Sequence, residues 1–127
     1  KSVLLLFILK TSQLIIMKFY IEAWTPRQTW LEMSTEKRME YMGQLGPAIQ
    51  QLTDMGTEII SWGTNDPNTH NRLGFDFFAI WKFPNEEIAR TVEDMVSGSG
   101  WYNYFDQVNL QGSPESPNDV IGKLINI

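Results

Sequence analysis

Residues 75–84 read Phe-Asp-Phe-Phe-Ala-Ile-Trp-Lys-Phe-Pro, and this stretch decides the fold. Aromatic and branched residues are typical of strands, and the final proline ends the run. The alternation of a strand places Phe75, Phe77, Ala79, Trp81 and Phe83 on one face and Phe78 and Ile80 on the other. A strand that is apolar on both faces is covered on both faces. The chain's own helices can supply one cover, and we expect a partner subunit to supply the other.

The composition describes a small acidic domain. The 127 residues suit one domain, and 43% of them are hydrophobic, which is enough for a core. The formal net charge of −5 argues against nucleic acid or an anionic membrane as the main partner. The sequence has no cysteine, which excludes disulfides, thiolate nucleophiles and Cys-ligated metals.

The first sixteen residues differ from the rest. The apolar run from Val3 to Leu9 is too short to span a bilayer, which takes about 20 residues. It also lacks the small-residue cleavage site of a secretory signal. We therefore expect residues 1–16 to be an extension outside the domain, Met17 to be the natural start, and the protein to be cytoplasmic. The alternative is an additional apolar strand or helix that packs on the domain or on a partner.

Beyond Met17, hydrophobic periodicity predicts four strands and two main helices. The strands are expected at 18–24, 58–62, 75–83 and 105–110, and the helices at 34–56 and 85–96. Gly46-Pro47 should kink or split the first helix. The connection 27–33 carries an exposed-looking Trp30, and one turn of helix is expected at 101–104. Residues 113–127 are expected to form a proline-containing linker and a short terminal helix or strand.

The resulting order, β-α-β-β-α-β over residues 17–112, is the ferredoxin-like pattern of an α+β domain. It predicts one four-stranded antiparallel sheet, in the strand order 4-1-3-2, with both helices on one face. The other face is then bare and largely apolar, and such a face is an association surface. Two of these faces packed together make a closed, symmetric homodimer.

Two stretches carry a resemblance to a known group. Trp62-Gly-Thr-Asn-Asp-Pro67 and Gly100-Trp-Tyr-Asn-Tyr-Phe-Asp-Gln-Val-Asn109 resemble a branch of small uncharacterised bacterial proteins in the dimeric α/β-barrel superfamily. That superfamily also includes cofactor-independent monooxygenases and muconolactone-isomerase-like proteins. The resemblance covers about residues 17–112. It implies a dimeric α/β barrel and activity on a small aromatic molecule without a cofactor, although this fold hosts many unrelated functions.

His70 is the single histidine and lies in the polar loop 63–74 with Asp66 and Arg72. A histidine beside a pocket can act as a general acid or base near neutral pH. The alternative is an exposed turn residue. One histidine and one aspartate are too few ligands for a metal ion, so no metal site is expected.

Aromatic side chains are dense for a domain of this size. Aromatic walls with a few polar tips suit a flat organic ligand. The ligand-binding candidates are Trp24, Trp62, Arg72, Trp81, Tyr102 and Tyr104, and Trp101 belongs to the same dense set. The alternative is packing in the core and in a dimer interface, where Trp and Tyr are also common.

Several polar residues lie inside or beside the predicted strands. They are Glu22, Asp76, Asp106, Gln107 and Asn109. In the order 4-1-3-2, Glu22 has either Asp76 or a residue of the fourth strand as its neighbour. Two close carboxylates on an apolar sheet would raise one pKa and provide a general base. The default alternative is that both carboxylates face solvent or pair with Lys82, Lys18 or Arg72.

Two functional hypotheses follow. The first is a cofactor-independent monooxygenase or isomerase, in which His70, Glu22 or Asp76 removes a proton from a small aromatic ligand. The second is a non-catalytic ligand-binding or protein-interaction module. It is favoured by the absence of a Ser-His-Asp signature, a dinucleotide fingerprint and a phosphate loop from the sequence. Neither hypothesis includes a cofactor.

Overall fold

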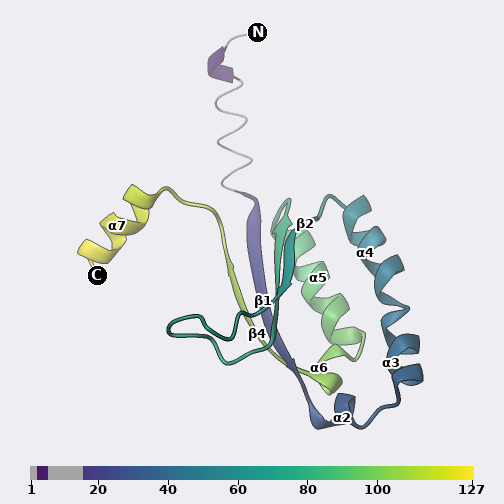
Figure 1. The fold of residues 1–127 in the computed structure, drawn as a ribbon. Coiled ribbons are helices and arrows are strands. Elements are labelled where there is room, and N and C mark those ends of the chain that lie inside the picture. The colour runs from purple at the N-terminus through teal and green to yellow at the C-terminus, as the bar shows by residue number, and fades with distance from the viewer. Residues whose placement is uncertain (1–2, 6–15) are drawn as a thin grey trace.

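The computed structural model describes residues 3–5 and 16–127, and its main feature is a four-stranded antiparallel sheet in the order β2-β3-β1-β4. The strands are β1 (Lys18–Pro26), β2 (Glu58–Thr64), β3 (Phe77–Phe83) and β4 (Phe105–Gly112). The helices are α2 (Gln28–Leu31), α3 (Thr35–Met42), α4 (Leu45–Asp54), α5 (Glu86–Gly98), α6 (Trp101–Tyr104) and α7 (Pro117–Ile125). Helices α3, α4 and α5 lie on one side of the sheet (Figure 1). The predicted α+β, ferredoxin-like fold and its strand order are confirmed.

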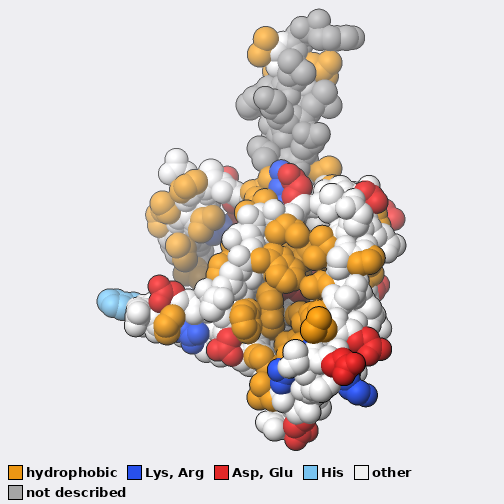
Figure 2. All heavy atoms as spheres, turned by 45° about the vertical axis from the view of Figure 1, so that its right-hand side comes forward, with side chains coloured by type: hydrophobic (Ala, Val, Ile, Leu, Met, Phe, Trp, Pro, Cys, Tyr) orange, Lys and Arg blue, Asp and Glu red, His pale blue; other side chains and the backbone are white. Residues whose placement is uncertain are grey.

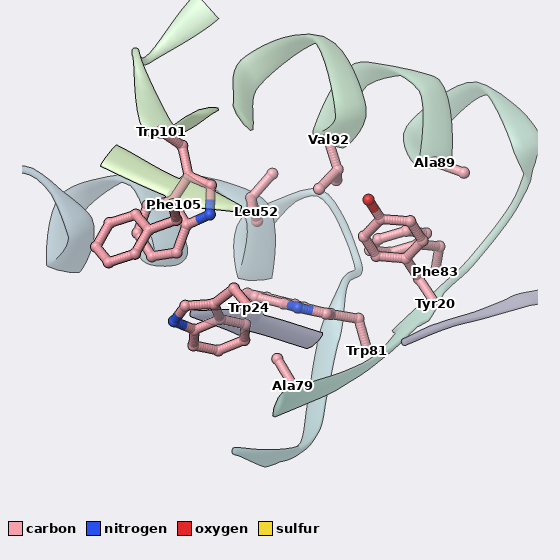
Figure 3. Close-up of a cluster of buried hydrophobic side chains, with 10 residues drawn as sticks. All are labelled: Tyr20, Trp24, Leu52, Ala79, Trp81, Phe83, Ala89, Val92, Trp101 and Phe105. Carbon is pink, nitrogen blue, oxygen red and sulfur yellow. The ribbon is translucent and has the colours of Figure 1, made fainter. Parts of the chain in front are cut away.

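The pairing register fixes which side chains share a face. Glu22 of β1 stands opposite Ala79 of β3 and opposite Asn109 of β4. The side chains of the helix-covered face form the buried core, together with Leu52 of α4 and Val92 of α5. Leu52 and Val92 point towards the sheet, on which Trp24 and Trp81 lie (Figure 3).

The opposite face of the sheet carries a second set of apolar side chains, which the alternation of the strands places there. They are Phe19, Ile21, Ala23, Phe78, Ile80, Val108 and Leu110, and we refer to them as the open face. Val108 and Leu110 are among the exposed large hydrophobic residues of the described chain. The expectation that β3 is apolar on both faces is therefore confirmed.

The ends of the helices follow local sequence signals. Ser34 accepts a hydrogen bond from the backbone N–H of Lys37 at the start of α3, and Asn85 accepts one from Ile88 at the start of α5. Gly56, with φ of +94°, follows α4 in the left-handed conformation that glycine adopts without steric cost. These residues therefore fix where α3 and α5 begin and where α4 ends.

The predicted helix 34–56 is divided in two, as Gly46-Pro47 suggested, but the break lies earlier, at Gly43 and Gln44. Pro47 is the third residue of α4. The first N–H groups of a helix have no acceptor within the helix, so proline is tolerated there. The proline therefore helps to start α4 and does not bend a continuous helix.

Three local expectations are refined. Trp30 is half-buried in the short helix α2, where its ring packs 4.8 Å from that of Phe105, so its exposed appearance in the sequence was misleading. Strand β3 begins at Phe77, two residues later than expected. The terminal element is a helix. The structure describes only 3–5 and 16 of residues 1–16. The expectation that this segment is an extension outside the domain therefore lies outside the described residues.

Candidate functional site

A cavity of about 190 Å³ lies on the helix-covered face, between the sheet and helices α3, α4 and α5. We call it the aromatic cavity. Its helical walls are mostly apolar and include Met42, Leu45, Ile49, Leu52, Met95 and Val96. Figure 2 shows hydrophobic side chains gathered around a hollow on this side of the molecule. The walls of the aromatic cavity are therefore largely apolar.

Four tryptophans wall the sheet side of the aromatic cavity, namely Trp24, Trp62, Trp81 and Trp101. The ring of Trp24 makes edge contacts with Trp62 at 5.5 Å and with Trp101 at 5.8 Å between centroids. Trp62 makes a similar contact with Trp81 at 5.9 Å. Edge-to-face pairs at these distances are favourable, so the four rings support one another in a defined arrangement.

Among the described residues that line the cavity, Glu22 is the only acidic one, and it is 7% exposed. Its Oε1 accepts a hydrogen bond from the indole N–H of Trp81 over 2.6 Å. Its Oε2 accepts one from Nε2 of Gln107 over 2.7 Å. Each oxygen of the carboxyl group thus has one fixed donor, which holds the group in place at the sheet.

Burial raises the pKa of the Glu22 carboxyl above its ordinary value, and the hydrogen bonds from Trp81 and Gln107 oppose this rise only in part. A carboxyl group with a raised pKa is a stronger base than an exposed one. Tyr20 lies on the same strand and face. Burial, and then the nearby carboxylate of Glu22, raise its pKa far above the usual range for a phenol. Glu22 is therefore a stronger base than an exposed glutamate, whereas Tyr20 holds its phenolic proton more tightly than an exposed tyrosine.

A short polar relay fixes the orientation of Gln107. Its Oε1 accepts a hydrogen bond from the indole N–H of Trp101 over 2.7 Å. Its Nε2 also donates to Oδ1 of Asn109 over 2.8 Å, besides its bond to Glu22. Because the acceptor end of the amide is occupied by Trp101, the donor end must face Glu22.

Three of the predicted ligand-binding residues, Trp24, Trp62 and Trp81, line the cavity. Tyr102 and Tyr104 do not line it. Tyr104 packs 4.9 Å from the ring of Tyr41, and Tyr102 accepts a hydrogen bond from Arg27 through its backbone oxygen. Their predicted contact with a ligand therefore stays a prediction.

The other predicted site residues lie in or beside the loop 65–76. This loop extends away from the helices, on the open-face side of the sheet (Figure 1). Arg72 donates to the backbone oxygens of Asp66 and Phe75 and so stabilises the loop itself. His70 is exposed, and Asp76 accepts a hydrogen bond from Thr25. The structure does not bring these residues to the aromatic cavity, and their catalytic roles stay predictions.

For Glu22, the default expectation of a solvent-facing or lysine-paired carboxylate was wrong. Its neighbour is a residue of the fourth strand, Gln107, and not Asp76. Sequence reasoning placed Gln107 on a strand but gave it no role, because its partner depends on the register of two strands. Trp101 was counted among the dense aromatics but was not selected, since it lies outside the strands.

The fold and the cavity together define a ferredoxin-like α+β protein with a buried carboxyl group in a tryptophan-walled pocket. The chain belongs to DUF6616, a family of unknown function whose profile matches residues 17–127. The match includes the C-terminal helix α7. Comparison with curated proteins gives no match.

Solved structures share the fold at low sequence identity. A mutant chlorite dismutase from Candidatus Nitrospira defluvii gives a TM-score of 0.65 at 10% identity and covers 84% of this chain. The match covers 43% of that protein, so this chain spans less than half of its length. The RPA0582 protein of unknown function from Rhodopseudomonas palustris gives 0.50 at 14% identity, covering 92% of this chain and 96% of that one. At these identities the likeness concerns the fold alone.

No helix in residues 3–5 and 16–127 is long and apolar enough to cross a membrane. Within the same residues, no group of three or more His, Asp or Glu side chains gathers in a way that could hold a metal ion.

Proposed function

We propose that the protein binds a small aromatic molecule in the aromatic cavity, and that Glu22 acts there as a general base without a cofactor. One observation carries the proposal. A carboxyl group that is 7% exposed lines a cavity whose remaining walls are mostly aromatic and aliphatic. Ionisable groups with perturbed pKa values in such pockets are the usual candidates for proton transfer.

The size of the cavity limits the ligand. An apolar protein cavity of about 150 Å³ is large enough to bind benzene. The 190 Å³ available here suit a single ring with a small substituent. The edges and faces of Trp24, Trp62 and Trp81 offer such a ring the edge-to-face contacts that aromatic groups prefer.

The Glu22 carboxylate has free lone pairs with which it can accept a proton from a bound molecule. A carboxylate has about four lone-pair sites, and Trp81 and Gln107 occupy one on each oxygen, so a bound molecule can use the others. A C–H or O–H proton of the ligand moves to Glu22, and the ligand keeps the electron pair. Return of the proton to another carbon completes an isomerisation. With dioxygen as second reactant, two hydrogens of one carbon are replaced by a carbonyl oxygen and water leaves, which is the monooxygenase alternative.

The test is hydrogen exchange on a probe of suitable size, such as acetophenone in D₂O, followed by proton NMR. The wild-type chain is expected to accelerate exchange of the acidic C–H protons. Glu22→Gln should lose this acceleration, and Ala48→Leu should lose it by filling the cavity. Gln51→Leu on the exposed side of α4 is the matched control and should behave like the wild type. Equal rates for wild type and Glu22→Gln would rule out the general base.

The second candidate is a non-catalytic ligand-binding module. It is favoured by the partners of Glu22, since Trp81 and Gln107 do not titrate and offer no second acid or base. Calorimetry distinguishes the two candidates. Binding of acetophenone without accelerated exchange would support the module, and absence of binding to the wild type would count against both.

We also propose that the protein works as a homodimer that pairs through the open face. The support is the apolar character of Phe19, Ile21, Phe78 and Leu110 on a face that no helix of α2 to α6 covers. The same pairing is implied by the superfamily resemblance.

A further inference from the structure

The C-terminal helix α7 contributes nothing to the core of its own chain. None of its residues is buried. Its apolar stripe consists of Val120, Ile121, Leu124 and Ile125, and the last two are 63% and 75% exposed. Figure 1 shows α7 standing apart from the sheet, on the side opposite to α3, α4 and α5. A helix with an uncovered apolar stripe needs a partner surface.

Local interactions nevertheless specify α7 as a helix. Ser116 caps it by accepting a hydrogen bond from the backbone N–H of Asp119 over 3.1 Å, and Pro117 occupies the first turn. Asp119 in the first turn and Lys123 in the last turn both suit the helix dipole. The helix is thus prepared by its own sequence before any partner covers it.

The linker holds α7 away from β4. Pro114 and Pro117 restrict the residues before them to extended backbone, and Ser116 has φ of −74° and ψ of 154°. Lys123 forms an ion pair with Glu115 over 2.7 Å, which joins the helix to its own linker. The stretch from the end of β4 to α7 therefore acts as a short, stiff arm.

The area of the open face shows how much α7 can add to a dimer interface. Four strands about 4.8 Å apart, each about seven residues long at about 3.3 Å per residue, cover about 440 Å² in projection. A standard interface buries about 800 Å² of accessible surface per partner. The stripe of α7, about 13 Å long and about 10 Å wide, adds about 130 Å² in projection. The stripe of α7 therefore enlarges the projected contact surface by about 30%, which brings a dimer closer to the area of a standard interface.

We propose that α7 is an arm that packs on a second copy of this chain, next to the partner sheet that covers the open face. This inference rests on the homodimer proposed above and adds a second contact surface to it. The open face and α7 lie on the same side of the molecule, so one partner can cover both (Figure 1). In a symmetric pair, each copy receives the arm of the other.

The charges favour this occupant over a membrane surface. The centre of the open face and the stripe of α7 carry no charged side chain, so two copies can meet there without burying a charge. Lys123 is the single basic residue of α7, and the whole chain has a net charge of −5. An anionic bilayer recruits helices with several basic residues, which α7 lacks.

The first test is the oligomeric state of the full chain, measured by native mass spectrometry over a dilution series. The wild type is expected to be a dimer, and Val108→Glu on the open face a monomer. The double variant Ile121→Gln with Leu124→Gln should raise the dimer dissociation constant at least tenfold. Lys123→Arg, away from the apolar stripe of α7, keeps the positive charge that pairs with Glu115, so it is the matched control and should leave the dissociation constant unchanged. A monomeric wild type would overturn the homodimer and the arm together, whereas a dimer equally tight in the double variant and the control would overturn the arm alone.

Hydrogen exchange of residues 117–125 shows on which chain the helix packs. The backbone amides of α7 should be protected in the wild-type dimer and exchange at least tenfold faster in the monomeric Val108→Glu variant. Unchanged protection in that monomer would mean that α7 packs on its own chain, which would overturn the exchanged arm. Circular dichroism of both variants checks that the domain remains folded.

Discussion

The indole N–H of Trp81 donates to Oε1 of Glu22 over 2.6 Å, across the pair of central strands β1 and β3. The same indole ring walls the aromatic cavity. The side chain of Trp81 therefore shapes the cavity and also offsets part of the free-energy cost of burying the Glu22 carboxyl group. Substitutions at Trp81 or Glu22 should therefore change both the stability of the protein and the proton affinity of the Glu22 carboxyl group.

Trp81→Phe removes the donor and keeps an aromatic ring. Removing the donor leaves a buried oxygen of Glu22 without its partner, which costs about 1–3 kcal/mol, so the free energy of unfolding should fall by about that amount. Urea unfolding measures it. Trp62→Phe is the matched control. Trp62 also lines the cavity but is 39% exposed, so this substitution should lower the unfolding free energy by less. Equal losses for the two variants would mean that ring volume, and not the hydrogen bond, matters at Trp81.

Glu22→Gln should change how stability depends on pH. The pKa of Glu22 is raised in the folded state above its ordinary value of 4.5, so the folded protein holds this proton more tightly than the unfolded chain. As pH rises from the ordinary pKa to the raised one, the wild type therefore loses stability, and the loss levels off above that range. Glutamine does not titrate. Thermal unfolding between pH 4 and pH 8 should show the wild type falling relative to the variant, and parallel curves would contradict the raised pKa.

Gly63→Ala tests the packing of the open face. A Cβ atom at Gly63 would lie 2.6 Å from Cζ of Phe78 in the neighbouring strand, so the ring must turn away. The end of a half-buried ring can move, and we expect a loss of about 1 kcal/mol in unfolding free energy together with weaker dimerisation. Gly112→Ala, where nothing lies within 4 Å, is the control in β4 and should leave both quantities near wild type.

Trp81→Ala and Phe77→Ala should differ, although the sequence suggested a similar role for both. Trp81 is in the buried core, and its truncation should cost about 3–5 kcal/mol. Phe77 is 37% exposed at the start of β3, so its truncation should cost clearly less. Chemical denaturation of both variants checks the order, and a larger loss at Phe77 would mean that its contact with Trp24 matters more than burial.

Much of the fold was predictable because strand alternation and helix periodicity are local signals. The two-faced pattern of residues 77–83 indicated the sheet, its helix cover and its open side. The site was less predictable. Glu22 alternates with apolar residues in β1 as a surface residue would, and only the positions of α4 and α5 make its face buried. The link from Trp101 through Gln107 to Glu22 joins residues far apart in the sequence, so no local pattern could indicate it.

The tryptophan walls give this protein a built-in optical reporter. Four of its five tryptophans line the aromatic cavity, and their rings stand 5.5–5.9 Å apart. At such spacings excitation energy passes readily from ring to ring, so the cluster responds to light almost as one chromophore. A molecule that enters among the rings changes the emission of all four. The fifth, Trp30, does not line the cavity and packs against Tyr41 and Tyr104, so we expect its emission to change less.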